Sequence, residues 1–178
     1  LHEMCINDGK TSLIGGNIGI PFSENIIWEM ESNINNPVHV LELSSFQLEY
    51  VKKFKPTIAG ILNISEDHMD RYPNFEAYAS IKIKLADYVS NNGWVIYNSD
   101  DPILSKALSN TPRSATFSTT NENDCYYKLN GSKVYSGSTN KPNILFNYNE
   151  TKLKGLHNLQ NILAASTIAN LFGISQEA

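Results

Sequence analysis

The sequence predicts an α/β fold, and two observations carry the prediction. Apolar runs of strand length alternate with helical segments through most of the 178 residues, which is typical of parallel βαβ units. In addition, the runs at 38–43 and 57–64 are nearly continuous in apolar residues. Such runs are typical of strands that are buried on both faces, as in a parallel sheet.

In the first half of the chain, strands are expected at 11–14, 38–43 and 57–64. The first strand is followed by Gly15-Gly16, where a turn is expected because paired glycines after an apolar run indicate one. A helix is expected at about 23–32, and its first residue is a serine that can cap it.

In the second half, a helix at 74–89, a strand at 94–97 and a final helix at 158–172 are expected. A glycine follows the final helix, in the position that favours the left-handed C′ conformation. From about 115 to 150, short strand-like runs alternate with turns, and residues 129–132 have the composition of a hairpin turn. This region is predicted to be a small antiparallel flap within the domain.

Composition and charge exclude several classes of protein. The chain carries 14 Lys and Arg against 18 Asp and Glu, a net charge of −4, so nucleic acid is not expected as a partner. No apolar run approaches the roughly 20 residues of a membrane-spanning helix, and no signal-peptide pattern opens the chain. Cys5 and Cys125 are too few for a disulfide framework or a CxxC metal site. A cytoplasmic protein without a membrane partner is therefore expected.

Asp8-Gly9-Lys10-Thr11 contains the Gly-Lys-Thr of a phosphate-binding loop. That loop needs G-x-x-x-x-G-K-[ST] between a strand and a helix, so that several backbone N–H groups converge on the phosphates. Here no glycine precedes Gly9, and a strand follows Thr11. We therefore interpret the segment as a turn.

Gly15-Gly16-Asn17-Ile18-Gly19 follows the first expected strand. Paired glycines at such a place allow backbone N–H groups to approach an anion closely. A tight turn without a ligand is the alternative, and the motif alone does not separate the two.

Glu42 stands at the carboxyl end of the expected strand 38–43. Ligands of open α/β sheets bind at this end of the strands, and a carboxylate is a preferred ligand of Mg²⁺. The alternative is an edge residue that faces solvent. The apolar strand before Glu42 favours the binding site.

Three carboxylates and a histidine follow the expected strand 57–64, in the segment Ser65-Glu66-Asp67-His68-Met69-Asp70-Arg71. Like charges at this spacing repel one another unless a cation or Arg71 offsets them. His68 could bind a metal or a substrate, because imidazole both ligates and donates. A solvated acidic loop is the alternative.

Lys82 lies in the apolar stripe of the helix 74–89. The stripe recurs at steps of three and four residues and consists of Phe75, Tyr78, Lys82, Leu85 and Val89. A lysine there must extend to the surface, pair with an acid or lose its charge. The alternatives are a lysine that reaches solvent and a functional lysine aimed at the acidic segment.

Asn158 and Asn161 stand three residues apart at the start of the final helix. Amide side chains at this spacing share a helix face and could bind the edge of a nucleotide base. For Asn158 alone, capping of the helix is the alternative. Asp100-Asp101 are expected to cap a short helix that begins near Pro102.

Taken in order, these segments resemble the central domain of the Mur ligases, the ATP-dependent amino-acid ligases of peptidoglycan synthesis. The resemblance covers essentially the whole chain, and SSFQLE is most similar to the D-glutamate-adding branch of the family. It rests on GGNIGIPF at 15–22, LELSSFQLE at 41–49, ILNISEDHMDRY at 61–72, the helix with Tyr78 and Lys82, Asn98-Ser99-Asp100-Asp101, and HNLQNILAA at 157–165.

This resemblance implies a Rossmann-like, P-loop NTPase-like sheet and a ligase that forms an acyl phosphate with ATP before an amine attacks it. The implied substrates are UDP-N-acetylmuramoyl-L-alanine, D-glutamate and ATP, with Mg²⁺ as the cofactor. Another Mur ligase, a folylpolyglutamate synthase and a non-catalytic nucleotide-sugar-binding module are the alternatives.

The resemblance also implies roles for single residues. Glu42, His68 and Lys82 are implied to be catalytic and to bind metal, with a carbamate on Lys82. The implied binding residues are Gly16, Asn17, Ser44 and His68 for the nucleotide-sugar substrate, and Asn158 and Asn161 for the adenine of ATP.

By the same resemblance, residues 1–178 would be an N-terminally truncated central domain. The family's phosphate-binding loop and its central strand would precede Leu1, and the two flanking domains would lie outside the chain. We therefore expect the 178 residues to be inactive and marginally stable alone, and the parent protein to be a monomer.

Overall fold

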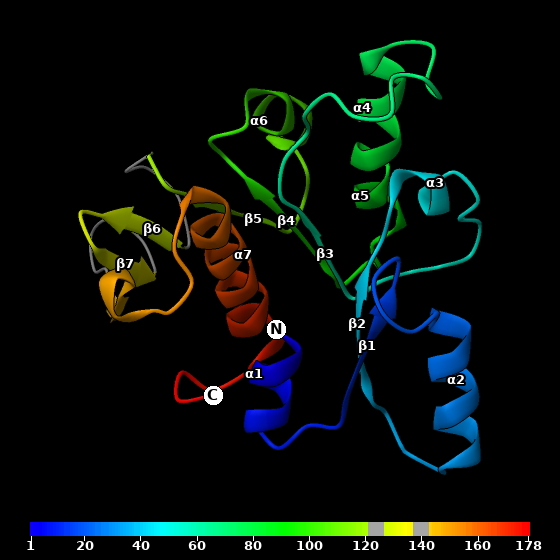
Figure 1. Cartoon of the computed structure of the whole chain (residues 1–178), viewed down its shortest axis with the longest axis horizontal. Coiled ribbons are helices and arrows are strands. Elements are labelled where there is room, and N and C mark those ends of the chain that lie inside the picture. The colour runs from blue at the N-terminus through cyan, green and yellow to red at the C-terminus, as the bar shows by residue number, and fades with distance from the viewer. Residues whose placement is uncertain (121–126, 137–142) are drawn as a thin grey trace.

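Parallel strand pairing organises the protein into two sheets (Figure 1). The computed structural model describes residues 1–120, 127–136 and 143–178, with residues 127–130 described by their backbone. A two-stranded sheet joins β1 (Ser12–Gly16) to β2 (Val38–Glu42) in parallel. The second sheet has six strands, which in spatial order are β3 (Ile58–Ile61), β4 (Trp94–Asn98), β5 (Ser114–Ser118), β6 (Tyr127–Asn130), β7 (Lys133–Ser136) and β8 (Asn143–Asn147).

The antiparallel flap is smaller than the predicted 115–150. β3, β4, β5 and β6 pair in parallel, so β5 belongs to the main sheet. Antiparallel pairing begins only with β6 and β7, and β8 continues it. The predicted hairpin turn is confirmed: Asn130 pairs with Lys133, and Gly131 has a φ of +62°, a value that glycine adopts without strain.

Helices cover both faces of the six-stranded sheet (Figure 1). α7 (Leu156–Phe172) packs against β3, β4 and β5 on one face, and α4 (Phe75–Ile83) and α6 (Pro102–Leu108) lie together on the other. The shorter elements are α3 (Ser45–Leu48), α5 (Leu85–Tyr88) and a 3₁₀ turn at Tyr148–Glu150.

The core confirms burial on both faces for the run at 57–64, where Ile61 belongs to one apolar cluster and Ile58 packs against the other, whereas no residue of β2 is buried. Along β4, Val95 and Tyr97 pack with Leu104 of α6, whereas Ile96 packs with Leu163 of α7. Successive strand residues point to opposite faces, so each face of β4 has its own apolar cluster.

Several element boundaries differ from the prediction. α2 (Phe22–Glu31) begins one residue earlier, after Pro21, and no side chain caps it, so the predicted cap by Ser23 is wrong. The predicted helix 74–89 is divided at Lys84 into α4 and α5. The final helix starts at Leu156, before the predicted 158, and Gly173 adopts the left-handed conformation that was expected after it.

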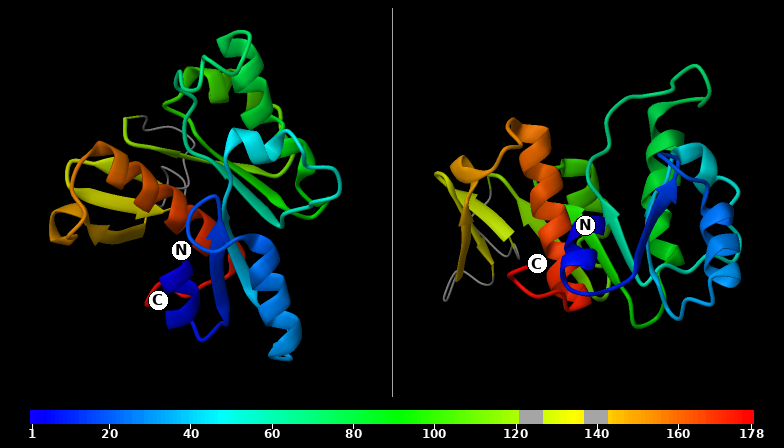
Figure 2. Two further views of the ribbon diagram at one scale, coloured as in Figure 1. Left: turned by 45° about the vertical axis from the view of Figure 1, so that its right-hand side comes forward. Right: turned by 60° about the horizontal axis from the view of Figure 1, so that its bottom comes forward.

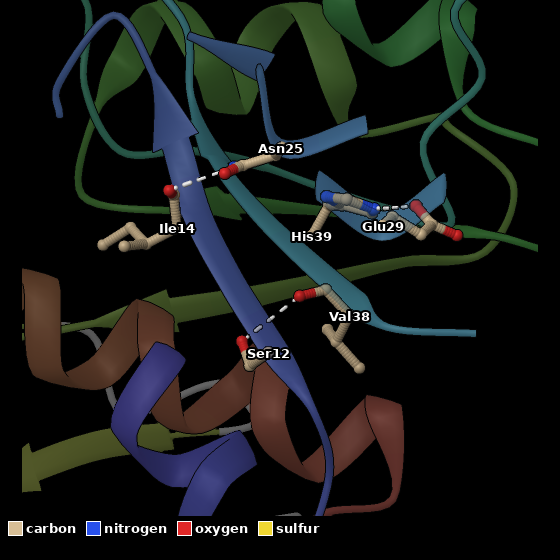
Figure 3. A network of polar contacts seen from close by, with 6 residues as sticks. All are labelled: Ser12, Ile14, Asn25, Glu29, Val38 and His39. Atoms are coloured by element: carbon tan, nitrogen blue, oxygen red, sulfur yellow. Dashed lines mark hydrogen bonds and ion pairs between the residues drawn. The ribbon is translucent and has the colours of Figure 1, made fainter. Parts of the chain in front are cut away.

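Polar contacts fix the two-stranded sheet and its neighbouring helix (Figure 3). Asn25 of α2 is 5% exposed and donates to the carbonyl of Ile14 in β1 at 3.1 Å. Ser12 donates to the carbonyl of Val38 at 3.2 Å, across the pair of strands. His39 of β2 lies 2.9 Å from Glu29 of α2. These contacts hold β1, β2 and α2 as one unit, with α1 (His2–Asn7) on the other side of β1 (Figure 2).

The two ends of the chain lie side by side (Figures 1 and 2). The amide of Ser175 donates to the Asp8 carboxylate at 2.9 Å, and Asn7 donates to the carbonyl of Ala178 at 3.2 Å. Among the described residues, no helix has both the length and the apolar character needed to cross a membrane.

Candidate functional site

Lys82 reaches the base of the acidic loop, residues 62–74, which connects β3 to α4. Its ammonium donates to the carbonyl of Asn63 at 3.1 Å and lies 5.5 Å from the centre of the Tyr78 ring. Asn63 is the second residue after β3, so the contact lies at the carboxyl end of the parallel sheet. Lys82 thus contacts the acidic loop but is only partly buried, so the contact agrees with both alternatives for this lysine.

The charge of Lys82 is disfavoured by burial and supported by three acids. Burial lowers the pKa of the Lys82 ammonium, and the negative charges of Asp67, Asp101 and Glu42 oppose this effect without cancelling it. These acids come from the acidic loop, the start of α6 and the end of β2. Lys82 thus lies within electrostatic reach of three separate segments at one end of the sheets.

One peptide group connects Lys82 to a buried acid. The Asn63 carbonyl accepts from Lys82, and the N–H of the same peptide bond, that of Ile64, donates to the Asp101 carboxylate at 2.8 Å. Asp101 is 9% exposed and Ile64 is 6% exposed. A peptide group that lies between a cation and an anion is paired on both sides and held in one orientation.

The two adjacent aspartates have different partners. Asp101 caps α6, as predicted, by accepting from the amides of Ile103 at 2.9 Å and Leu104 at 3.1 Å. Asp100 does not cap the helix, so this half of the prediction is wrong.

Instead, Asp100 binds the segment that follows β5. It accepts from the amide and hydroxyl of Thr119 at 2.6 and 2.8 Å, from Thr120 at 2.8 Å, and from the Ser118 hydroxyl. Burial alone would raise the pKa of Asp100, but these hydrogen bonds lower it.

His68 lies at a turn of the acidic loop. Its φ is +54°, and its carbonyl accepts from the amides of Arg71 at 2.9 Å and Tyr72 at 3.3 Å. The imidazole is 43% exposed, with Nε2 at 3.4 Å from an Asp67 oxygen and the ring at 4.7 Å from that of Phe46. The imidazole is therefore accessible to a ligand, while hydrogen bonds hold the backbone turn beneath it.

Glu42 ends β2 and is exposed, so its carboxylate is accessible at the carboxyl end of that strand. Among the residues that the structure describes, no three His, Cys, Asp or Glu side chains are gathered closely enough to hold a metal ion. The carboxylates and the imidazole at this end of the sheets are groups that bind divalent cations, but they do not form a closed set of ligands.

The glycine turn, residues 15–19, is packed directly onto the end of β2. The Gly16 amide donates to the Ile20 carbonyl at 2.9 Å, and the Asn17 amide donates to the Glu42 carbonyl at 2.8 Å. A Cβ on Gly15 would lie 2.3 Å from the Ile20 oxygen, and one on Gly16 would lie 2.2 Å from the Glu42 oxygen. The amides of Gly16 and Asn17 are thus already paired, so the structure favours the tight turn over an anion site made by these two groups.

Ser44 caps α3 in a reciprocal arrangement with Gln47. The Gln47 amide donates to the Ser44 hydroxyl at 3.3 Å, and the Ser44 amide donates to the Gln47 side-chain oxygen at 2.9 Å. This capping box orients α3 after Glu42. The SSFQ sequence carries this signal, but we expected only a substrate contact from Ser44.

Asn158 and Asn161 lie on α7, on the other face of the sheet from Lys82. Asn158 is not the N-cap, because the helix begins after Gly155. The side-chain amide of Asn158 donates to the Lys154 carbonyl at 2.8 Å. Asn161 is exposed. The structure therefore does not bring these two asparagines together with the Lys82 site.

Sequence reasoning missed a group of side chains between α3 and the acidic loop. Glu49 accepts from Arg71 at 2.7 Å and from the Tyr72 hydroxyl at 2.7 Å. All three residues lie in segments that were quoted for the resemblance, yet Glu49 and Tyr72 had been given no role. Arg71 was expected only to offset the acids of its own segment, and the structure pairs it with Glu49. An acid that follows a short helix does not by itself indicate which distant residues it contacts.

Comparison with known proteins gives one consistent family. The family described as Mur ligase middle domain matches residues 25–169. A UDP-N-acetylmuramoylalanine--D-glutamate ligase of Thermoanaerobacter sp. (strain X514) is 37% identical over 181 residues, which cover 99% of this chain and 38% of that protein. An equally named ligase of Streptococcus thermophilus (strain CNRZ 1066) is 32% identical over 179 residues, with 100% and 38% covered. The chain thus spans 38% of the length of these relatives.

Solved structures share the fold. A UDP-N-acetylmuramoyl-L-alanyl-D-glutamate--2,6-diaminopimelate ligase superposes with a TM-score of 0.73 at 22% identity, covering 98% of this chain and 40% of the other. A MurF ligase from Thermotoga maritima, solved in complex with ADP, gives a TM-score of 0.58 at 16% identity, with 98% and 48% covered. At these identities the similarity concerns the fold alone.

Proposed function

The chain belongs to the Mur ligase family, and on that premise we propose that it is the central domain of a longer, ADP-forming ligase that adds D-glutamate to UDP-N-acetylmuramoyl-L-alanine. The names of the curated relatives support this substrate pair, and the family match over residues 25–169 supports the central position. We assign residues 1–178 to one domain, with the antiparallel strands β6–β8 as its flap.

The placement of Lys82 carries the proposal. A lysine whose pKa is lowered by burial, and that lies near three acids at the carboxyl end of a parallel sheet, is typical of a functional site. We propose that its amine is converted to a carbamate, because the neutral amine is the form that reacts with carbon dioxide. The resulting anion would bind metal where an ammonium could not.

Glu42 and His68 would bind Mg²⁺ together with this modified lysine. When bound, Mg²⁺ would neutralise negative charge on the phosphates of ATP as the phosphoryl group moves to the substrate carboxylate. The protein's own contribution is the position of these three side chains, which come from β2, the acidic loop and α4. The Glu42 carbonyl accepts from the glycine turn, the His68 carbonyl accepts from the amides of its own turn, and the Lys82 ammonium donates to the Asn63 carbonyl.

Gly16, Asn17, Ser44 and His68 would contact the nucleotide-sugar substrate, and Asn158 and Asn161 would bind the adenine of ATP. The exposure of the Asn17 and Asn161 side chains supports their availability to a ligand. The backbone amide of Asn17 and the hydroxyl of Ser44 are already paired within the protein. Their contribution to binding would therefore come from the Asn17 side chain and from the remaining capacity of the Ser44 hydroxyl.

An assay of ADP release by the full-length gene product tests the proposed reaction. We expect release that requires UDP-N-acetylmuramoyl-L-alanine, D-glutamate and Mg²⁺ together. Parallel reactions with meso-diaminopimelate as the amine, or with a folate and L-glutamate, distinguish another Mur ligase and a folylpolyglutamate synthase. Binding of the nucleotide sugar without ADP release under any condition would instead indicate a non-catalytic binding module.

Two further measurements test the remaining assignments. Intact mass after incubation with bicarbonate should show an added carbon dioxide that is absent from Lys82→Met. Sedimentation of the full-length protein should give a monomer, and fractionation of cells should place it in the cytoplasm.

A further inference from the structure

Glu49 uses both oxygens of its carboxylate to join two segments at the candidate site. One oxygen accepts from Arg71 Nη2 at 2.7 Å, and the other accepts from Tyr72 Oη at 2.7 Å. Glu49 follows the last residue of α3, whereas Arg71 and Tyr72 lie near the end of the acidic loop. The Tyr72 hydroxyl, together with Arg71, lowers the pKa of Glu49, so the carboxylate stays ionised. We call these three residues the Glu49 clamp.

Phe46 of α3 lies among the groups that the clamp holds. Its ring is 6.2 Å from the Tyr72 ring in a stacked arrangement, and the Arg71 guanidinium lies 5.2 Å from the ring centre. The imidazole of His68 packs against this same ring, with the two ring centres 4.7 Å apart. Tyr72 is 7% exposed, and its ring centre lies 5.3 Å from that of Tyr78 in α4, so the arrangement is anchored in the core.

The backbone connects the clamp to His68 by a second route. The amides of Arg71 and Tyr72 both donate to the His68 carbonyl, at 2.9 and 3.3 Å. His68 itself has a φ of +54°, a left-handed conformation that is unfavourable for a non-glycine residue and that its surroundings must maintain. Fixing Arg71 and Tyr72 therefore fixes the turn on which His68 stands.

We infer that Glu49 is a positioning residue, which holds Arg71 and Tyr72 so that the imidazole of His68 is kept against Phe46 at the carboxyl end of the sheet. The chemical use of His68 rests on the proposed function. The clamp itself is a matter of geometry and can be tested without any reaction.

The geometric test observes the imidazole directly. In full-length protein labelled with ¹³C and ¹⁵N at histidine, His68→Asn identifies the His68 ring signals, which the nearby Phe46 ring should shift. We expect Glu49→Gln to move these signals towards those of a free imidazole and to leave the other histidines unchanged. Glu76→Gln, which changes an exposed acid on α4, is the matched control. Unchanged His68 signals in Glu49→Gln would overturn the inference.

The kinetic test separates positioning from simple loss of structure. For Glu49→Gln we expect the kcat of ADP release to fall about 10- to 100-fold, with little change in the KM for ATP. Tyr72→Phe keeps the buried ring and loses one contact of the clamp. Its kcat of ADP release should therefore also fall, and this variant remains informative if Glu49→Gln folds poorly. Because the clamp acts as a unit, the double variant should be no slower than Glu49→Gln alone.

The possible failures are distinguishable. A wild-type kcat in folded Glu49→Gln would contradict the positioning role while leaving the proposed ligase intact. A wild-type protein that releases no ADP would contradict the proposed function, and the histidine spectra would still decide whether Glu49 positions His68.

Discussion

The glycine turn and the acidic loop meet the same end of the sheets, yet they are held in different ways. In the glycine turn, backbone groups contact backbone groups, and a Cβ on Gly16 would lie 2.2 Å from the Glu42 oxygen. In the acidic loop, side chains from other segments make the contacts: Lys82 and Asp101 bind the Asn63–Ile64 peptide group, and Glu49 binds the side chains of Arg71 and Tyr72.

This difference predicts how each region responds to substitution. A turn that is fixed by close backbone approach has no space for a larger residue, so substitution should affect stability. A loop that is fixed by hydrogen bonds and charges keeps its volume when one partner changes, so substitution there can affect function more than stability. The predictions below test this distinction, from the largest expected effect on stability to the smallest.

Gly16→Ala should have the largest effect. The added Cβ would lie 2.2 Å from the Glu42 oxygen, at a φ of +114° that alanine rarely adopts. Overpacking and backbone strain together should lower the free energy of unfolding by about 4 kcal/mol, measured by chemical denaturation of the full-length protein.

Gly19→Ala is the matched control for this prediction. Gly19 has a φ of +78°, but a Cβ there would meet nothing within 4 Å. Its cost should be the strain alone, about 1 kcal/mol. Equal losses in the two variants would show that close packing does not govern the glycine turn.

Asp101→Ala should have the next largest effect, because it leaves three backbone amides without their acceptor. The amides of Ile103 and Leu104 lose their cap, and the buried amide of Ile64 loses its partner. We expect a loss of about 3 kcal/mol in the free energy of unfolding.

Asp101→Ser divides this effect between the helix and the loop. Serine can cap α6 but is too short to accept also from Ile64. About half of the free energy of unfolding that Asp101→Ala loses should therefore be recovered in Asp101→Ser. The part of this free energy that serine does not recover measures how strongly Asp101 holds the acidic loop. Full recovery of stability with serine would contradict the proposed connection to Ile64.

Lys82→Met should reduce activity far more than stability. The methionine fills the apolar stripe without a charge, and burial already disfavours the ammonium, so we expect an unchanged or slightly higher melting temperature. ADP release by the full-length protein should fall at least about 100-fold. A clear loss of melting temperature would show that Lys82 holds the acidic loop mainly for stability.

The sequence was sufficient to predict the parts of the fold that depend on local pattern. The continuous apolar run at 57–64 predicted a strand with apolar clusters on both faces. Asn74 caps α4 through its contact with the Ala77 amide, at the predicted start of that helix. The sequence also predicted Lys82 as an anomaly, because a charge in an apolar stripe is visible from spacing alone.

Contacts between distant segments could not be predicted in the same way. Asp100 and Asp101 are chemically identical neighbours, and only the packing of β5 against β4 decides that the first binds residues 118–120. Likewise, Glu49 meets Tyr72 because α3 packs against α4, which no local pattern specifies. Whether Glu42, His68 and Lys82 bind metal together, and whether Asn158 and Asn161 bind adenine, remain predictions.

Asp8 provides the smallest effect and the limiting case of a side-chain contact. Like the acidic loop, the chain ends are joined through a carboxylate, which binds Lys10 and the Ser175 amide, but here near the surface. The hydrogen bond from Lys10, followed by that from Ser175, lowers the pKa of Asp8 from 3.8 to about 2. Because the pKa is lowered in the folded state, the stabilisation is present above pH 3.8 and is lost as the pH falls through about 2.

Asp8→Asn lacks this dependence, so its melting temperature should lie slightly below that of the wild type at neutral pH and converge with it towards pH 2. A constant difference across this range would show that the contact acts through shape and not through charge, which would separate it from the contacts that hold the acidic loop.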